Sequence, residues 1–190
     1  MNFVSHPRIR KARKICGKTL IFRNATESDA AFIFSLRRDE RKSRYISPTS
    51  DGLDSQLAWL KNYSTAEDQA YFIIYFNDEA IGTVRIYDCV EDDFSWGSWI
   101  ISANAPGHAA IESALILYAY ALDFLEFKKS HFSVRKLNKS VCRFHERFGA
   151  IKLSENQVDI VYSITESAIE KSRKKYHKFL PEKIVVEYLV

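Results

Sequence analysis

The chain has 190 residues, of which 46% are hydrophobic and 27% are charged. This length fits a single domain, and the composition is typical of a globular protein that can bury a core. No stretch is long enough to span a membrane, and the first residues lack the apolar segment of a secretory signal. Cys16, Cys89 and Cys142 show neither disulfide nor metal-ligand spacing. We therefore expect a cytoplasmic protein without a metal site.

The positive charge of the chain is concentrated at its start. The net charge is +4, and residues 1–18 carry six basic side chains and no acidic one. Subtracting these six from the 28 basic residues leaves 22, against 24 acidic residues. A body that is not basic argues against nucleic acid as the main partner, although the basic start leaves such a contact open. We expect a loosely ordered basic arm over residues 1–18 and one domain over residues 19–190.

The first half of the chain alternates between strand and helix signals. A short strand is expected at residues 19–22. Thr26 and Asp29 then form a capping box, which predicts a helix over residues 28–38. Apolar residues at helical spacing predict a second helix, and segments rich in aromatic and β-branched residues predict three strands. These elements are expected at residues 54–63 for the helix and at residues 71–76, 80–87 and 94–101 for the strands.

The second half of the chain opens with a turn at residues 102–107, and apolar residues at helical spacing then predict a helix over residues 108–124. Further on we expect a strand at residues 131–134, a helix at 138–148, a strand at 158–164, a helix at 166–179 and a strand at 184–190. This order predicts an α+β fold. Its central sheet is mixed and mostly antiparallel, with helices on both faces and a parallel crossover around residues 94–134.

The strand, turn and helix over residues 94–124 carry the first chemical signal. The first backbone N–H groups of a helix have no partner within it, and with the helix dipole they favour an anion such as a pyrophosphate. Gly107 lets a ligand approach the backbone, and the small Ala109 and Ala110 keep the first turn open. A glycine before a helix is also common in simple turns, so this pattern alone does not decide between the two.

The order of elements and two segments resemble the GCN5-related N-acetyltransferase (GNAT) family over roughly residues 19–165. The family has a loop of the form Gln/Arg-x-x-Gly-x-Gly/Ala. The segment Asn104–Ala109 matches this loop at Gly107 and at its small last residue, with Asn104 replacing the Gln or Arg. The segment Asn138–Ala150 is similar to a late helix of the family, which has the form Asn-x-x-[small]-x-x-Leu-Tyr-x-x-x-Gly-Phe.

The resemblance implies an N-acetyltransferase that uses acetyl-CoA as its co-substrate. In the family, backbone amides of the turn hold the pyrophosphate. The preceding strand splays from the next one, so that its backbone pairs with the pantetheine arm. One N–H of that strand polarises the thioester carbonyl. The residues that the resemblance implies for coenzyme binding are Trp99, Ile100, Ile101, Asn104, Gly107, His108, Ala109, Ala110 and Asn138.

Two catalytic residues are also suggested by the resemblance. The late helix of the family often carries a Tyr that protonates the leaving thiolate, and His145 stands at that position here. Imidazole titrates near neutral pH, so His145 is the candidate acid, with structural packing as the alternative. Many relatives have a Glu that acts as the general base at the position where this chain has Ser95. Asp93, on the same strand face, is the candidate base, with Asp88, Asp92 or a chain of waters as alternatives.

In the family, the segment between the first two helices lines the acceptor pocket. Here that segment contains Arg38, Arg44 and Tyr45, which suit an anionic acceptor through bidentate hydrogen bonds and stacking. Trp96 is a further substrate-binding candidate, and core packing is its alternative. The similarity to the branch with SRYIS-like and FSWGSWII-like segments favours a small-molecule amine, specifically a nucleotide-linked amino sugar.

Other functions remain open at this point. The runner-up acceptor is the N-terminal amine of a protein. Because the Glu is missing and the Tyr is replaced, an inactive coenzyme-binding or interaction module is a further alternative. A nucleic-acid binder that uses residues 1–18 is the third. The sequence also leaves a homodimer open.

Overall fold

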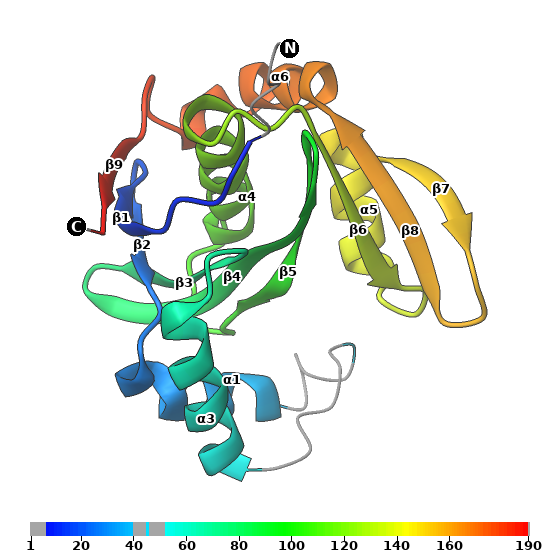
Figure 1. Ribbon diagram of the computed structural model, residues 1–190. Coiled ribbons are helices and arrows are strands. Elements are labelled where there is room, and N and C mark those ends of the chain that lie inside the picture. Colours follow the sequence, from blue (N-terminus) through cyan, green and yellow to red (C-terminus); the bar gives the residue numbers. More distant parts are fainter. Residues whose placement is uncertain (1–6, 40–44, 46–51, 190) are drawn as a thin grey trace, which may run out of the picture.

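The computed structural model describes residues 7–39, 45 and 52–189. Its strands form one nine-stranded sheet in the order β7-β8-β6-β5-β4-β3-β2-β1-β9 (Figure 1). Neighbouring strands are antiparallel except β5 and β6, which are parallel. The strands are β1 (Ala12–Cys16), β2 (Leu20–Asn24), β3 (Ala70–Phe76), β4 (Glu79–Val90), β5 (Asp93–Ile101), β6 (Lys129–Arg135), β7 (Ile151–Glu155), β8 (Asp159–Thr165) and β9 (Val185–Tyr188).

The described helices lie between groups of strands along the chain. They are α1 (Ala30–Arg38), α3 (Gly52–Thr65), α4 (Ala109–Ala119), α5 (Lys139–Phe148) and α6 (Glu166–Lys175). Short 3-10 turns, Glu27–Asp29 and His177–Phe179, precede α1 and follow α6, and a π-helical turn, Tyr120–Phe124, extends α4. The mixed, mostly antiparallel α+β sheet expected from the sequence is confirmed.

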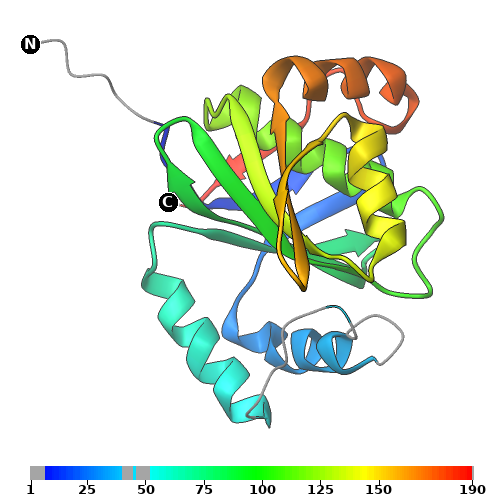
Figure 2. The ribbon, with the colours of Figure 1, turned by 90° about the vertical axis from the view of Figure 1, so that its right-hand side faces the viewer.

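Two cores lie on opposite faces of the sheet because alternate residues of a strand face opposite sides. Phe72 and Ile74 of β3 belong to the larger core, which also contains residues of α4, α5 and α6. Tyr71 and Ile73 belong to the smaller core with residues of α1 and α3. Figure 2 shows α1 and α3 below the sheet and the other three helices above it. Helices therefore cover both faces, as expected.

The parallel strands β5 and β6 pair over a short distance and then separate. Their paired residues are Asp93 with Lys129, Phe94 with Ser130 and Ser95 with His131. Beyond these pairs β5 continues along β4, while β6 continues along β8, so the two strands diverge towards their carboxyl ends (Figure 1). The predicted splayed parallel pair is present.

A β-bulge in β5 accompanies this divergence. Arg85 of β4 pairs with Gly97, but Thr83 pairs with Ile100, so β5 holds one extra residue at this point. Ser98 within the bulge has a φ of 47°, in the left-handed region. A bulge bends its strand and increases the local twist, which turns the end of β5 away from the plane of β6.

A buried carboxylate connects the start of β2 to the start of α4. Glu112 is fully buried and accepts hydrogen bonds from the Thr19 amide at 2.6 Å, the Thr19 hydroxyl at 2.6 Å and the Leu20 amide at 2.9 Å. Gly17 lies against the same carboxylate, since a Cβ there would come within 2.9 Å of the Glu112 Oε1. These contacts fix the amino-terminal end of α4, where the sequence predicts the pyrophosphate site.

The structure corrects the extent of the loosely ordered arm. Residues 12–16 form β1, which lies between β2 and β9 in the sheet. The strand gave no period-2 pattern in the sequence, because its two buried residues are three positions apart across an irregularity between residues 12 and 14. Ala12 and Ile15 are fully buried, whereas the exposed Arg13 forms an ion pair with Glu187 of β9. Strand β7 also carried no sequence signal, because its residues are exposed on both faces of the sheet edge.

Candidate active site

A cavity of about 620 Å³ occupies the space where β5 and β6 diverge. Its wall contains residues of both strands, and it extends to both faces of the sheet. Ala110 of α4 and Val141 of α5 contribute to it on one face, and Arg37 of α1 contributes on the other. The cavity therefore connects the α4/α5 side with the α1/α3 side through the gap in the sheet. Such a passage can hold two ligands that enter from opposite faces and meet in the middle.

The turn before α4 is open. Gly107 is exposed, and a Cβ added there would meet nothing within 4 Å. The Ala109 amide donates to the Pro106 carbonyl at 2.9 Å, so this amide already has a partner inside the turn. Ala110 lines the cavity, while the predicted Asn104 is exposed and lies outside the cavity wall. The backbone of the turn, more than the Asn104 side chain, is therefore placed for an anion.

His108 has a structural side chain. Its Nε2 lies 2.9 Å from the Thr19 hydroxyl and 3.6 Å from the buried Glu112 carboxylate. Its ring also packs against Phe76 and Phe179. These contacts turn the imidazole towards the start of β2 and away from the cavity, so any contribution of His108 to ligand binding must come from its backbone.

The cavity side of β5 presents backbone that no strand covers within the described chain. Trp99, Ile100 and Ile101 all line the cavity, as the sequence predicts for the pantetheine-binding strand. The bulge is held by the Thr83 hydroxyl, which donates to the Ser98 carbonyl at 2.7 Å. The indole of Trp99 donates to the Ser113 hydroxyl at 3.1 Å, which anchors this strand to α4.

Two further predicted residues, Trp96 and Asn138, line the same cavity. Trp96 is almost completely buried, and its indole nitrogen donates to the Tyr118 hydroxyl at 3.2 Å. Asn138 is the N-cap of α5, and its side chain accepts from the Val141 amide at 3.4 Å. Both side chains thus have structural partners in addition to their position on the cavity wall.

His145 lies at the centre of an aromatic cluster on the cavity wall. Its ring centroid is 4.2 Å from that of Phe132 and 5.3 Å from that of Trp96, and the residue is 4% exposed. Its Nδ1 is buried without a hydrogen-bond partner. Burial lowers the pKa of His145 from 6.5 to about 3, because an imidazolium would lose its hydration there. The imidazole is therefore neutral at neutral pH and is not the imidazolium acid expected from the sequence.

Asp93 does not reach the cavity. It lies at the end where β5 and β6 are still paired, and its carboxylate is 2.9 Å from the Nδ1 of His131. The Nε2 of His131 lies 3.4 Å from Asp88, so both carboxylates are within hydrogen-bonding distance of the same imidazole. Neither of them, nor Asp92, lines the cavity. The prediction of Asp93 as the general base is therefore wrong. Asp93 lies where β5 and β6 are paired, whereas the cavity opens further along β5, where the two strands separate.

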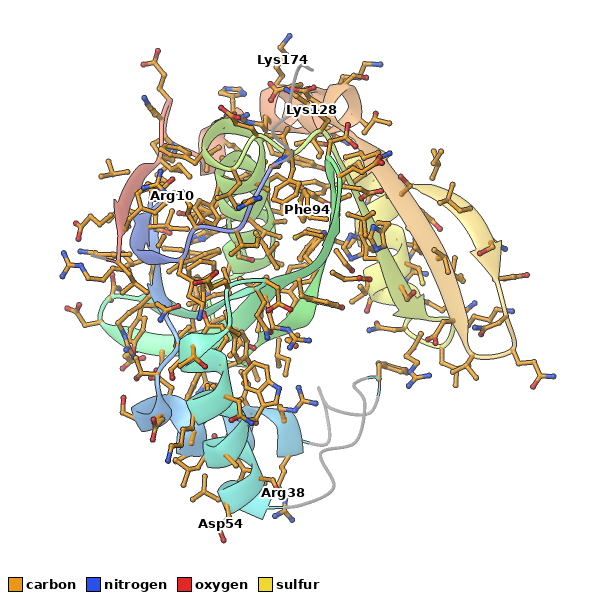
Figure 3. The ribbon with its side chains drawn as sticks, viewed as in Figure 1. Arg10, Arg38, Asp54, Phe94, Lys128 and Lys174 are labelled. Atoms are coloured by element: carbon orange, nitrogen blue, oxygen red, sulfur yellow. The ribbon has the colours of Figure 1, made fainter. Side chains whose placement is uncertain are left out.

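Of the two arginines at the end of α1, Arg37 lines the cavity and the predicted Arg38 does not. Arg38 is exposed and packs over the Phe34 ring, with its guanidinium carbon 5.3 Å from the ring centroid. Figure 3 shows Arg38 at the lower end of the molecule, near Asp54 and remote from the diverging strands. Tyr45 lines the cavity as expected. Arg44 lies outside the described residues.

Two cavity residues of β4, Arg85 and Tyr87, were missed at the sequence level. They lie on the same strand face as Thr83, with one residue between neighbours. The guanidinium carbon of Arg85 lies 4.4 Å from the centroid of the Tyr87 ring. Gly97 makes room for this stack, since a Cβ there would come within 2.9 Å of the Tyr87 hydroxyl. The glycine in the FSWGSWII segment was the available signal.

Comparison with known proteins identifies this architecture. Residues 19–151 match the family model described as the acetyltransferase (GNAT) domain. The chain belongs to the GNAT family. It is therefore an acyl-CoA-dependent N-acetyltransferase with the fold and the splayed strands of this family.

Solved structures of GNAT proteins give the closer comparisons. Apo FdhC, described as a nucleotide-linked sugar GNAT, is 36% identical, with a TM-score of 0.79, and the match covers 91% of this chain and 99% of that one. A GCN5-related N-acetyltransferase from Brucella melitensis is 17% identical, with a TM-score of 0.75 and coverage of 94% and 91%. Comparison with curated protein sequences gives no match.

A third GNAT structure contains ligands. Spermidine N-acetyltransferase from Vibrio cholerae, in complex with CoA and spermine, is 17% identical to this chain, with a TM-score of 0.69 and coverage of 80% and 98%. At this identity the likeness concerns the fold alone. In the described part of this chain, no helix is both long and apolar enough to cross a membrane.

Proposed function

We propose that this GNAT protein transfers an acetyl group from acetyl-CoA to the primary amine of a nucleotide-linked amino sugar. The observation that carries the proposal is the cavity that passes between β5 and β6 and joins an open helix start on one face to two arginines on the other. The 36% identity to FdhC over 91% of the chain supports the acceptor class.

The α4/α5 side fits the coenzyme. The open turn at Gly107 leaves room for a pyrophosphate beside the first amides of α4. The β5 backbone from Trp99 to Ile101 lines the cavity and offers main-chain groups to an extended pantetheine arm, as an added strand would. When bound, acetyl-CoA supplies the thioester from which the acetyl group is transferred. Neutral His145 and the apolar rings around it form a wall of low polarity beside this part of the cavity.

Asp93 and an imidazolium of His145 cannot carry out the proton transfers of this reaction, so other groups must do so. Asp159 is the only carboxylate among the described residues of the cavity wall, and it pairs with Arg135 at 3.4 Å. His145 is neutral, so it can offer a hydrogen bond but not the proton of an imidazolium. We therefore assign removal of the ammonium proton to water in the cavity. When the amine attacks, the C–S bond breaks, and the second proton lost by the amine nitrogen reaches the leaving thiolate through the same water. An N–H of His145 donates a hydrogen bond to that sulfur without giving up its proton.

The test is an acetyl-transfer assay that follows release of the free CoA thiol. The acceptor panel contains amino sugars linked to uridine, thymidine and guanosine diphosphates, together with spermidine and a peptide with a free N-terminal amine. We expect turnover with at least one nucleotide-linked amino sugar and none with the peptide. Turnover confined to the peptide or to spermidine contradicts the acceptor class. Tight CoA binding without turnover on any acceptor supports the inactive module.

A further inference from the structure

The cavity wall on the α1/α3 face carries a hydroxyl beside the point where β5 separates from β6. Tyr87 of β4 is half-buried and lines the cavity. We propose that the Tyr87 hydroxyl holds the attacking amine of the acceptor by accepting a hydrogen bond from its N–H. This inference rests on the proposed function, because it names the residue that orients the acceptor for the same transfer.

Strand pairing places Tyr87 at the start of the gap. Tyr87 is opposite Ser95, and Ser95 is the last residue of β5 that pairs with β6. The phenol extends along β5 beyond this pair, since a Cβ on Gly97 would come within 2.9 Å of the phenol oxygen. The hydroxyl therefore lies over the first part of β5 that has separated from β6, next to the bulge that contains Ser98.

The two faces of β5 carry different groups at this level. Trp96 and Gly97 are neighbours on the strand, so they face opposite sides of the sheet. Trp96 packs against His145, with 5.3 Å between the ring centroids, on the α4/α5 side. The space over Gly97 holds the Tyr87 phenol on the α1/α3 side. An acceptor that enters from the α1/α3 side therefore meets Tyr87 where it approaches the coenzyme side.

The ring of Tyr87 is held in place by Arg85. The guanidinium carbon of Arg85 lies 4.4 Å from the ring centroid, and its Nη1 donates to the Gln69 side-chain oxygen at 3.2 Å. Arg85 pairs with Tyr71 of the smaller core, which places Arg85 and Tyr87 on the α1/α3 face. A stacked guanidinium orients an aromatic ring and leaves its hydroxyl unused. The phenol oxygen is therefore in position before an acceptor binds.

The Tyr87 hydroxyl is free to bind a ligand. Within the described part of the chain it makes no hydrogen bond to another residue. A phenol oxygen can accept from the N–H of an amine, whereas the guanidinium of Arg85 has only donors. Holding one N–H limits the directions in which the nitrogen lone pair can point, and such orientation lowers the barrier to attack. Tyr87 gains and loses no proton in this role, so the ammonium proton still passes to water.

The variant Tyr87→Phe tests the inference, because it removes the hydroxyl and keeps the ring. Rates of CoA release are measured with acetyl-CoA and amino sugars linked to uridine, thymidine and guanosine diphosphates. With the acceptor that wild type uses, we expect kcat/KM to fall by about three- to tenfold, the effect of losing one hydrogen bond between neutral groups. The Kd for CoA, measured by calorimetry, and the melting temperature should stay at their wild-type values.

Two further readouts separate this role from a purely structural one. Tyr188→Phe is the matched control, because Arg10 stacks on the Tyr188 ring at 3.7 Å and Tyr188 does not line this cavity. We expect wild-type kinetics from this control. The second readout is the pH dependence of kcat/KM. In Tyr87→Phe the profile should be lower at every pH and unchanged in shape, because Tyr87 exchanges no proton.

The outcomes separate this inference from the proposed function. If Tyr87→Phe acetylates the acceptor as fast as wild type does, the role of the hydroxyl is refuted and the proposed function stands. A pH profile of changed shape also refutes it, because Tyr87 would then exchange a proton. If the loss of rate is matched by a loss of CoA affinity or of melting temperature, the hydroxyl serves the fold and not the amine. If wild type acetylates none of the acceptors, the proposed function fails, and this inference fails with it.

Discussion

Replacing His145 with Phe is expected to remove a specific pH dependence of folding. The pKa of His145 is lowered by burial to about 3, from 6.5 when the chain is unfolded. Above pH 6.5 both states are neutral, and the group contributes no pH dependence. As the pH falls below 6.5, the unfolded chain binds a proton that the native state rejects, so stability is lost between about pH 6.5 and pH 3.

The size of this effect follows from the two pKa values. At about pH 5 the unfolded imidazole is almost fully protonated and the native one is not, which destabilises the fold by roughly 2 kcal/mol relative to neutral pH. For a chain of this length, that corresponds to a melting temperature lower by about 4–8 °C. A Phe in the same aromatic cluster has no proton to bind, so His145→Phe should lose this part of the pH dependence.

The measurement is urea unfolding of wild type and His145→Phe at about pH 8 and about pH 5. All other titrating groups are shared, so the difference between the two proteins isolates His145. His177→Gln is the control, because His177 is exposed and its removal should leave the wild-type pH dependence unchanged. If wild type and His145→Phe lose the same stability on acidification, His145 titrates normally and the burial reasoning is wrong.

Three further substitutions test other parts of the site. Gly107→Glu should raise the Kd for CoA at least about tenfold by placing a carboxylate beside the pyrophosphate, whereas Gly107→Ala should bind normally; calorimetry decides, and normal binding by the Glu variant removes the turn from the site. Gly97→Ala should displace the Tyr87 ring and raise the acceptor KM more than the acetyl-CoA KM, and equal KM values for wild type and variant refute this. Glu112→Gln should cost roughly 2–4 kcal/mol in urea unfolding, since an amide cannot accept from all three donors; a loss below about 1 kcal/mol contradicts the role of this carboxylate.

Much of the fold was predictable because local patterns and long-range packing agree. The FSWGSWII segment, for example, reads as a strand and forms β5. Strand β1 was missed because its buried residues, Ala12 and Ile15, are three positions apart across a register shift, so the segment lacks the period of two that strand prediction uses. Strand β7 was missed because neither face is buried, and exposure of both faces removes the periodic signal on which strand prediction depends.

The site was predictable on the coenzyme side and less so on the acceptor side. Trp99 to Ile101 and Ala110 reach the cavity because their positions follow from the strand and helix themselves. The choice between Arg37 and Arg38 depends on helix phase. Arg37 follows the buried Ile33 by four residues and therefore shares its inward face, a relation visible in the sequence. Arg85 was not predictable, because its role depends on a gap between strands that only the tertiary structure reveals.

The burial of His145 could also not be predicted from the sequence. Phe132, Trp96 and Phe144 come from three different elements, and only their convergence strips water from the imidazole. Residue identity alone suggests a group that titrates near neutral pH. Burial lowers the pKa of His145 instead, so its imidazole is a neutral hydrogen-bonding group and not an acid at neutral pH.

The central claim is that one cavity brings two ligands together from opposite faces of the sheet. A crystal structure of the protein with CoA and a nucleoside diphosphate tests it most directly. We expect the CoA pyrophosphate beside Gly107, its thiol between β5 and β6, and the second diphosphate on the α1/α3 side of the cavity. Density for both molecules on the same face of the sheet, or for CoA away from the diverging strands, would contradict the account.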